Sequence, residues 1–146
     1  MRTSIEKFLA VPRPKFVGVR HLISFEEEDY LTREDVHQGL QILSDHGLTF
    51  DLQSYPNTIK HIPLIAEKFP KLKMVIDHIG KPNYLENGFA GWAKDISALA
   101  KYKNVHCKLS GMINEVPFWS TESFRPYVQH CLGRAIIDIQ LREGRL

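Results

Sequence analysis

The hydrophobic positions of this chain form four short apolar runs, at residues 16–20, 48–53, 74–79 and 105–110. Each run is too short for a typical helix, and the first contains two β-branched residues, Val17 and Val19, which predicts strands. Each is followed by a segment with helical spacing of its apolar positions. In the first such segment Val36, Leu40 and Leu43 share one face. We expect that helix to begin near Thr32 and to end at Gly47.

The other helices are predicted from the same kind of pattern. One runs from Pro63 to about Phe69, with Pro56 in a turn before it. The next carries Phe89, Trp92, Ile96 and Leu99 on one side. A last helical region begins at Thr121 and should be interrupted or restarted by Pro126.

Strands and helices that alternate in this way predict an α/β fold of parallel strands with right-handed crossovers. Two architectures fit the pattern, an open doubly wound sheet and an arc of a (β/α)8 TIM barrel. No Gly-rich phosphate loop of the GxGxxG or GxxxxGK type occurs, which disfavours a nucleotide-binding sheet. A whole barrel takes about 250 residues, so 146 residues supply about four βα units.

Composition places the chain among ordinary globular domains, with 43% hydrophobic residues. A formal charge of +2, spread along the chain, gives no basic stripe of the kind that binds nucleic acid. No apolar run approaches the roughly 20 residues that cross a bilayer. Two cysteines and the absence of a secretory signal lead us to expect a cytoplasmic protein with no membrane or nucleic-acid partner.

The candidate chemistry lies where the predicted strands end, because ligands bind at the carboxyl ends of parallel strands. His78 is the best candidate, since an imidazole there can polarise a carbonyl, relay a proton or bind a metal. A histidine satisfied by a backbone carbonyl is the structural alternative. Strand alternation assigns Asp77 to the opposite face, as a brace for a helix or loop. Lys81 either meets an anionic group or is simply solvated.

Further polar residues stand near the ends of the first, second and fourth strands. Arg20 and His21 could recognise a carboxylate, although an ion pair with a nearby acid explains the arginine equally well. Lys108, with Ser110, lies in a strand where a buried lysine must face the barrel interior or pair with an acid. Asp51 and Gln53 offer similar inward-facing polar atoms. No His-x-His pair is present, so the usual two-histidine metal entry is missing.

Four segments together resemble consecutive signatures of the amidohydrolase-related (amidohydrolase 2) family of lactonases, which includes sugar-acid and pyrone-dicarboxylate lactonases. They are FVGVRH at 16–21, GLTFDL at 47–52, VIDHIGKP at 75–82 and VHCKLSG at 105–111. The resemblance implies strands three to six of a (β/α)8 barrel. It implies a hydrolase that opens a cyclic ester by water attack on the carbonyl, with a small-molecule lactone as substrate.

The resemblance also implies roles for single residues. His78 matches the strand-five histidine, which binds the carbonyl oxygen or, if a divalent metal such as zinc is used, the metal. Arg20 and His21 match a segment facing the substrate. Lys108 and Ser110 match the Lys-Leu-Ser-Gly strand, and Lys81 lies in the Gly-Lys-Pro turn. We therefore expect His78 to be catalytic, and the substrate to be bound by Arg20, His21, Lys81, Lys108 and Ser110.

The departures from the family pattern define the competing interpretation. The family's His-x-His strand and its terminal catalytic aspartate strand have no counterpart here, and Asp138 stands in no matching context. We accordingly divide the chain into an N-terminal segment (1–15), a partial barrel (16–132) and a divergent tail (133–146). The chain is then either a hydrolase or an inactive isoform or fragment, which at most binds a partner or self-associates through open barrel edges. An unrelated open doubly wound binding domain is a third reading.

Overall fold

The computed structural model describes residues 7, 16–84 and 88–134. Four short strands form its sheet: β1 Gly18–His21, β2 Thr49–Leu52, β3 Lys73–Ile76 and β4 Val105–Cys107. The helices after them are α2 Glu34–Asp45, α3 Pro56–Ile59, α4 Ile62–Lys68, α5 Phe89–Leu99 and α6 Thr121–Gly133. Single 3-10 turns cover Ile23–Phe25, Tyr30–Thr32, Asp77–Gly80 and Met112–Asn114. The predicted rhythm of four βα units is confirmed.

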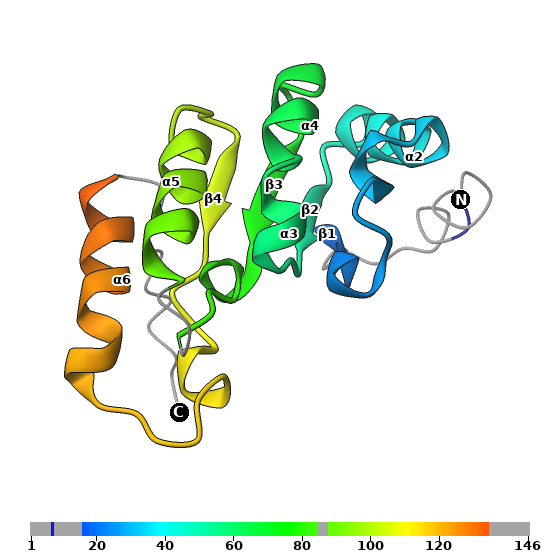
Figure 1. Ribbon diagram of the computed structural model, residues 1–146. Helices are drawn as coiled ribbons and strands as arrows, with labels where there is room; N and C mark the ends of the chain where they lie inside the picture. Colours follow the sequence, from blue (N-terminus) through cyan, green and yellow to red (C-terminus); the bar gives the residue numbers. More distant parts are fainter. Residues whose placement is uncertain (1–6, 8–15, 85–87, 135–146) are drawn as a thin grey trace.

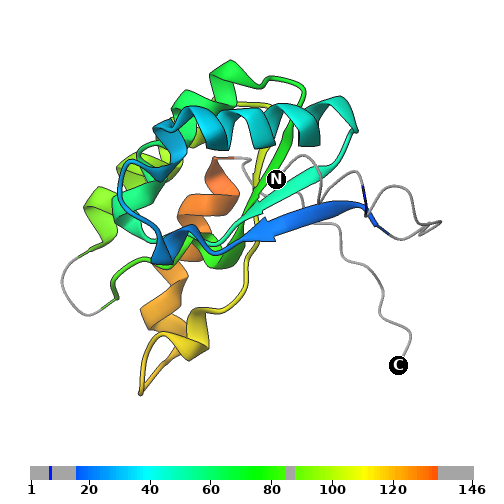
Figure 2. The ribbon, with the colours of Figure 1, turned by 90° about the vertical axis from the view of Figure 1, so that its right-hand side faces the viewer.

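The sheet is parallel throughout, and its strands lie in chain order, β1-β2-β3-β4. Each helical connection returns the chain to the next strand along, and α2, α4 and α5 lie on the same side of the sheet (Figures 1 and 2). A doubly wound sheet would reverse its strand order and carry helices on both faces. Sequential order with helices on one face is the geometry of a barrel arc.

The two faces of the sheet differ sharply in polarity. On the helix side the strands bury Phe50, Met74, Ile76 and Val105, all at most 4% exposed, within the hydrophobic core. The strand register puts Arg20, Asp51, Val75 and His106 in one row across the other face. That row is half-buried or exposed. A continuous apolar run such as 74–79 is typical of a strand buried on both faces, but in β3 every second residue faces the open side of the sheet.

Helix ends follow local sequence signals in one case and depart from the prediction in another. Gly47, at φ +63°, ends α2 as expected: the Leu48 N–H donates to the Leu43 carbonyl and the Gly47 N–H to the Ser44 carbonyl. The start expected near Thr32 comes slightly later along the chain. The Thr32 hydroxyl donates to the Asp29 carbonyl within a 3-10 turn, and α2 begins two residues later.

Prolines explain two further differences. The predicted turn at Pro56 is the short helix α3, where proline takes the first turn and loses no helical hydrogen bond. Pro126 was expected to interrupt the last helix, yet α6 runs through it. The carbonyl left without a helical donor belongs to Glu122, which is exposed and can be hydrated.

One side chain links two βα units of the barrel arc. The Asn104 side-chain amide, just before β4, donates to the carbonyls of Ala66, Phe69 and Leu72 at 3.3, 3.1 and 3.2 Å. These carbonyls lie at the end of α4 and in the turn that leads to β3. The backbone carbonyl of Asn104 in turn accepts from the Met74 N–H at 2.8 Å. Asn104 thus fixes the spacing of β3 and β4 at the amino end of the sheet.

Within the described residues, no helix is long and apolar enough to cross a bilayer. Most of the predicted N-terminal segment (1–15) and of the divergent tail (133–146), including Asp138, lies outside the described residues.

Candidate active site at the carboxyl ends of the strands

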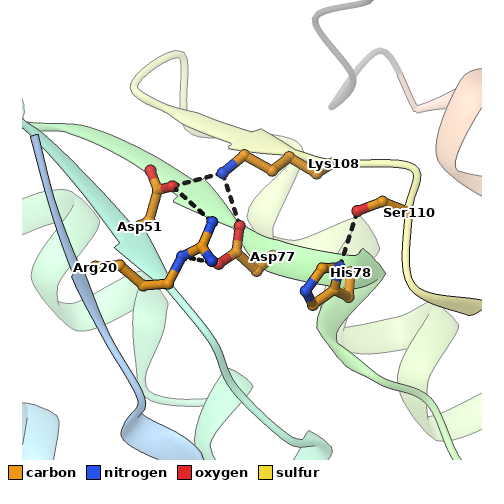
Figure 3. A network of polar contacts seen from close by, with 6 residues as sticks. All are labelled: Arg20, Asp51, Asp77, His78, Lys108 and Ser110. Atoms are coloured by element: carbon orange, nitrogen blue, oxygen red, sulfur yellow. Dashed lines mark hydrogen bonds and ion pairs between the residues drawn. The ribbon is translucent and has the colours of Figure 1, made fainter. Parts of the chain in front are cut away.

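Four charged side chains form a network on the open face of the sheet, which we call the charged quartet: Arg20, Asp51, Asp77 and Lys108 (Figure 3). Lys108 Nζ donates to Asp51 Oδ2 at 2.5 Å and to Asp77 Oδ1 at 2.8 Å. Arg20 Nε lies 2.8 Å from Asp77 Oδ2, and its Nη2 lies 3.5 Å from Asp51 Oδ2. The four residues come from β1, β2, and the segments after β3 and β4.

The balance of charges in this network offsets the cost of burying the Asp77 carboxylate. Two cations face two carboxylates, so its formal charge is zero. Asp77 is fully buried, and a carboxylate at 0% exposure requires such partners. Burial alone lowers the pKa of Lys108, but the hydrogen bonds to Asp51 and Asp77 outweigh it and raise the pKa above its ordinary value. Lys108 therefore stays protonated at neutral pH.

His78 and Ser110 form a second polar pair beside the quartet. His78 Nδ1 lies 2.9 Å from Ser110 Oγ, a hydrogen bond between the segments that follow β3 and β4 (Figure 3). Gly111 packs against the imidazole, and a Cβ there would lie 2.6 Å from two ring atoms. Gly111 also has φ +74°, which favours glycine. The ring is therefore held on one side by Ser110 and on another by the backbone of Gly111.

The prediction for Asp77 is wrong about its side of the sheet. Alternation carries Asp77 to the same face as Val75, where it joins Arg20 and Lys108. The strand ends at Ile76, and His78 has φ +56°, outside the β region. Alternation therefore cannot relate His78 to Asp77, although both reach the same end of the sheet.

The remaining sequence-predicted site residues divide between the network and other partners. Arg20, Lys108 and Ser110 are brought together as described. His21 instead turns toward Glu26, with Nε2 2.9 Å from Oε1, and stacks on the Tyr30 ring at 4.9 Å. As the residue next to Arg20 in a strand, it faces the other way.

Lys81 is also engaged elsewhere. Its Nζ lies 2.9 Å from Glu115 Oε1 and 5.2 Å from the centroid of the Tyr55 ring. The hydrogen bond to Glu115 raises the pKa of Lys81. The side chain is 15% exposed, so the simple solvated lysine is excluded. It joins the loop after β2, the turn after β3 and the loop after β4.

Sequence reasoning missed the parts played by Glu115, Tyr55 and Gly111. Glu115 and Tyr55 stand in loops, where no periodicity fixes their direction. Gly111 carried a usable signal, because a glycine directly after the strand polar residues often permits close approach of backbone to a neighbouring group.

The donors at this site do not fit a complete zinc centre. Both carboxylates of the quartet are occupied by cations. Across residues 7, 16–84 and 88–134, no group of three or more His, Cys, Asp or Glu side chains is placed to hold a metal ion. Zinc takes four ligands in structural sites and three protein ligands in catalytic ones. His78 alone is insufficient, and we derive no step through a metal.

Comparison with known proteins shows the family of this chain. The family described as Amidohydrolase matches residues 4–138. An L-fucono-1,5-lactonase of Burkholderia ambifaria is 32% identical over 127 residues, covering 86% of this chain and 42% of that protein. A second L-fucono-1,5-lactonase, from Burkholderia multivorans, is 24% identical over 132 residues, covering 84% and 44%.

Solved structures show the same fold. A crystal structure of an amidohydrolase from Burkholderia multivorans with bound zinc superposes with a TM-score of 0.80 at 22% identity, covering 92% of this chain and 50% of that one. An amidohydrolase 2 from Bifidobacterium longum subsp. infantis gives a TM-score of 0.55 at 16% identity, covering 89% and 56%.

The fold is thus a partial (β/α)8 barrel. The chain belongs to the amidohydrolase family, which confirms the resemblance seen in its sequence. It spans less than half the length of the lactonases it matches.

Proposed function

We propose that this protein acts in the hydrolysis of a sugar-acid lactone or a related cyclic ester, by attack of water on the lactone carbonyl. The observation that carries the proposal is the His78–Ser110 pair at the carboxyl ends of β3 and β4, beside the charged quartet. The 32% identity with an L-fucono-1,5-lactonase supports a lactone as the substrate.

The geometry suits His78 to bind the carbonyl oxygen. When the Ser110 hydroxyl donates to Nδ1 of a neutral imidazole, the ring hydrogen lies on Nε2. Nε2–H can then donate to the carbonyl oxygen and stabilise the negative charge that develops when water attacks. Arg20, half exposed at the same end of the sheet, is placed to donate to ring hydroxyls.

The charge of the quartet favours an uncharged lactone. Because both cations are already neutralised by Asp51 and Asp77, the network offers no net positive charge to a carboxylate on the substrate. A neutral polyhydroxylated lactone can exchange hydrogen bonds with the quartet without breaking an ion pair. We infer that sugar lactones fit this site better than pyrone dicarboxylates.

A second candidate is a catalytically inactive chain that binds the lactone without opening it. The observation favouring it is that, at the site the structure describes, both carboxylates are ion-paired and neither is left to activate water. The share of the lactonase length that this chain covers fits either candidate.

The test is an assay of the purified 146-residue chain with L-fucono-1,5-lactone and with a lactone that carries a free carboxylate. Acid release measures hydrolysis, and saturation-transfer NMR measures binding. Hydrolysis of the neutral lactone above the buffer rate, reduced at least tenfold in His78→Ala and unchanged in His46→Ala, an exposed histidine at the end of α2, would support the hydrolase.

The outcomes separate the candidates. Binding that His78→Ala abolishes, with no hydrolysis, would establish the inactive chain. No binding and no hydrolysis by a folded chain would reject both proposals. Stronger binding of the carboxylated lactone would reject the charge argument alone.

A further inference from the structure

The backbone that carries His78 makes a left-handed turn. His78, Ile79, Gly80 and Lys81 have φ values of 56°, 48°, 70° and 45°. L-residues other than glycine avoid this region at a cost of about 1–2 kcal/mol each, and a β-branched isoleucine is the least suited. Three such residues within four positions persist only where neighbouring elements fix them.

Contacts on both sides of Ile79 supply that restraint. Its side chain is fully buried. Its N–H donates to the Lys108 carbonyl at 3.0 Å, which ties the turn to the segment after β4. Its carbonyl accepts from Trp92 Nε1 at 2.6 Å, which ties the turn to α5. Both backbone polar groups of the most strained residue are therefore satisfied from outside the turn.

Trp92 is well placed for this part because its side chain is buried and packed against other rings. Its indole is 1% exposed and packs against Phe89, Tyr127 and His130, with ring centroids 5.0–5.8 Å away. The direction of its N–H is thus set by the packing of α5 against α6. Without that donor the Ile79 carbonyl would be buried and unpaired, which costs about 1–3 kcal/mol. The strained turn would then lose one of the contacts that hold it.

We propose that Trp92 is a positioning residue for His78. Its indole N–H holds the Ile79 carbonyl, keeps the left-handed turn in place, and so aims the imidazole at Ser110. Relaxation of the turn at His78 and Ile79 toward ordinary backbone angles would carry the His78 side chain away from Ser110 and Gly111. This inference rests on the proposed function in one respect only: the position of His78 matters for the reaction if His78 binds the lactone carbonyl.

The test replaces the N–H group of the Trp92 indole. In the 146-residue chain, Trp92 is replaced by benzothienylalanine, in which sulfur takes the place of the N–H and the ring shape is kept. The readout is the NMR signal of the His78 imidazole, recorded with and without Ser110→Ala. Trp119, which is 57% exposed, receives the same replacement as the matched control.

We expect the replacement at 92 to shift the His78 ring signals, and Ser110→Ala to have no additional effect on them. The replacement at 119 should leave them unchanged. Unchanged His78 signals in the folded 92 variant would overturn the proposal, even if its melting temperature fell, because a merely structural role predicts that result.

A second variant covers the case in which loss of the donor unfolds the chain. Replacing Trp92 with 5-fluorotryptophan keeps the N–H and makes it a stronger donor, so the fold should persist. Because the donor is kept, we expect the His78 signals to stay at their wild-type positions, and a shift as large as that expected from loss of the N–H would contradict the proposal. Neither measurement uses a lactone, so the result stands apart from the success or failure of the hydrolysis assay.

Discussion

Asp77 is the residue on which the charged quartet depends. It is fully buried and contacts both Arg20 and Lys108, whereas Asp51 is 23% exposed. Removing its charge would leave two cations to share a single carboxylate. A small side-chain change at Asp77, just after β3, should therefore affect all four members of the charged quartet.

We therefore expect Asp77→Asn to lower the free energy of unfolding by about 2 kcal/mol, less than the loss of a fully buried pair because both cations are partly exposed. Urea denaturation checks the value. Glu122→Gln, which removes an exposed pair with Arg125, is the control and should change stability by less than about 0.5 kcal/mol. Equal effects of the two changes would contradict the buried role of Asp77.

Lys108 adds a pH dependence to the same network. Its folded pKa is raised above the ordinary 10.5, so its contribution to stability is fully present below the unfolded pKa and is lost as pH rises through the folded pKa. The stability difference between wild type and Lys108→Met should stay constant at neutral pH and shrink above about pH 10.5. A difference that instead shrinks between pH 6 and 8 would show that another group controls the network.

At the scale of elements, two glycines should respond to alanine in opposite directions. In Gly111→Ala the new Cβ meets the His78 ring and the residue keeps φ +74°, so stability should fall by about 1–2 kcal/mol. In Gly91→Ala, inside α5 with open space around it, stability should rise by about 0.5–1 kcal/mol. Thermal unfolding of both variants compares them, and a gain at 111 would refute the close packing against His78.

Sequence patterns predicted which strands and helices form better than they predicted the residues at which these begin and end. Apolar runs and helical spacing gave the four βα units, because burial of one face imposes those periods. The site was only partly predictable. Arg20 and Lys108 follow strand alternation, but His78 depends on a left-handed turn fixed by Trp92 and Lys108, which lie 14 and 30 positions further along the chain. Such long-range restraint leaves no local signal.

At the scale of the whole molecule, the sheet has outer strands β1 and β4 with no further strand beside them among the described residues. An unpaired strand edge can pair with another chain. Phe118 and Trp119, 92% and 57% exposed after β4, add apolar surface. Self-association through these edges remains a prediction, and the sequence alone could not set its strength.

We expect the purified chain to elute with an apparent mass that rises with concentration in size-exclusion chromatography with light scattering. Replacing Val17, which is 70% exposed beside β1, with lysine should reduce that rise, because edge charges oppose pairing. Lysine in place of Leu64, an exposed residue of α4, serves as the control. A constant monomer mass at all concentrations would reject the prediction.

Asn104 carries a consequence for the ageing of the protein. Its amide group points at three carbonyl oxygens at once. Spontaneous deamidation would replace that donor with a carboxylate, which offers only acceptors to three other acceptors. This exchange of an NH2 group for OH, a mass gain of roughly one dalton, would then weaken the contact between two neighbouring βα units.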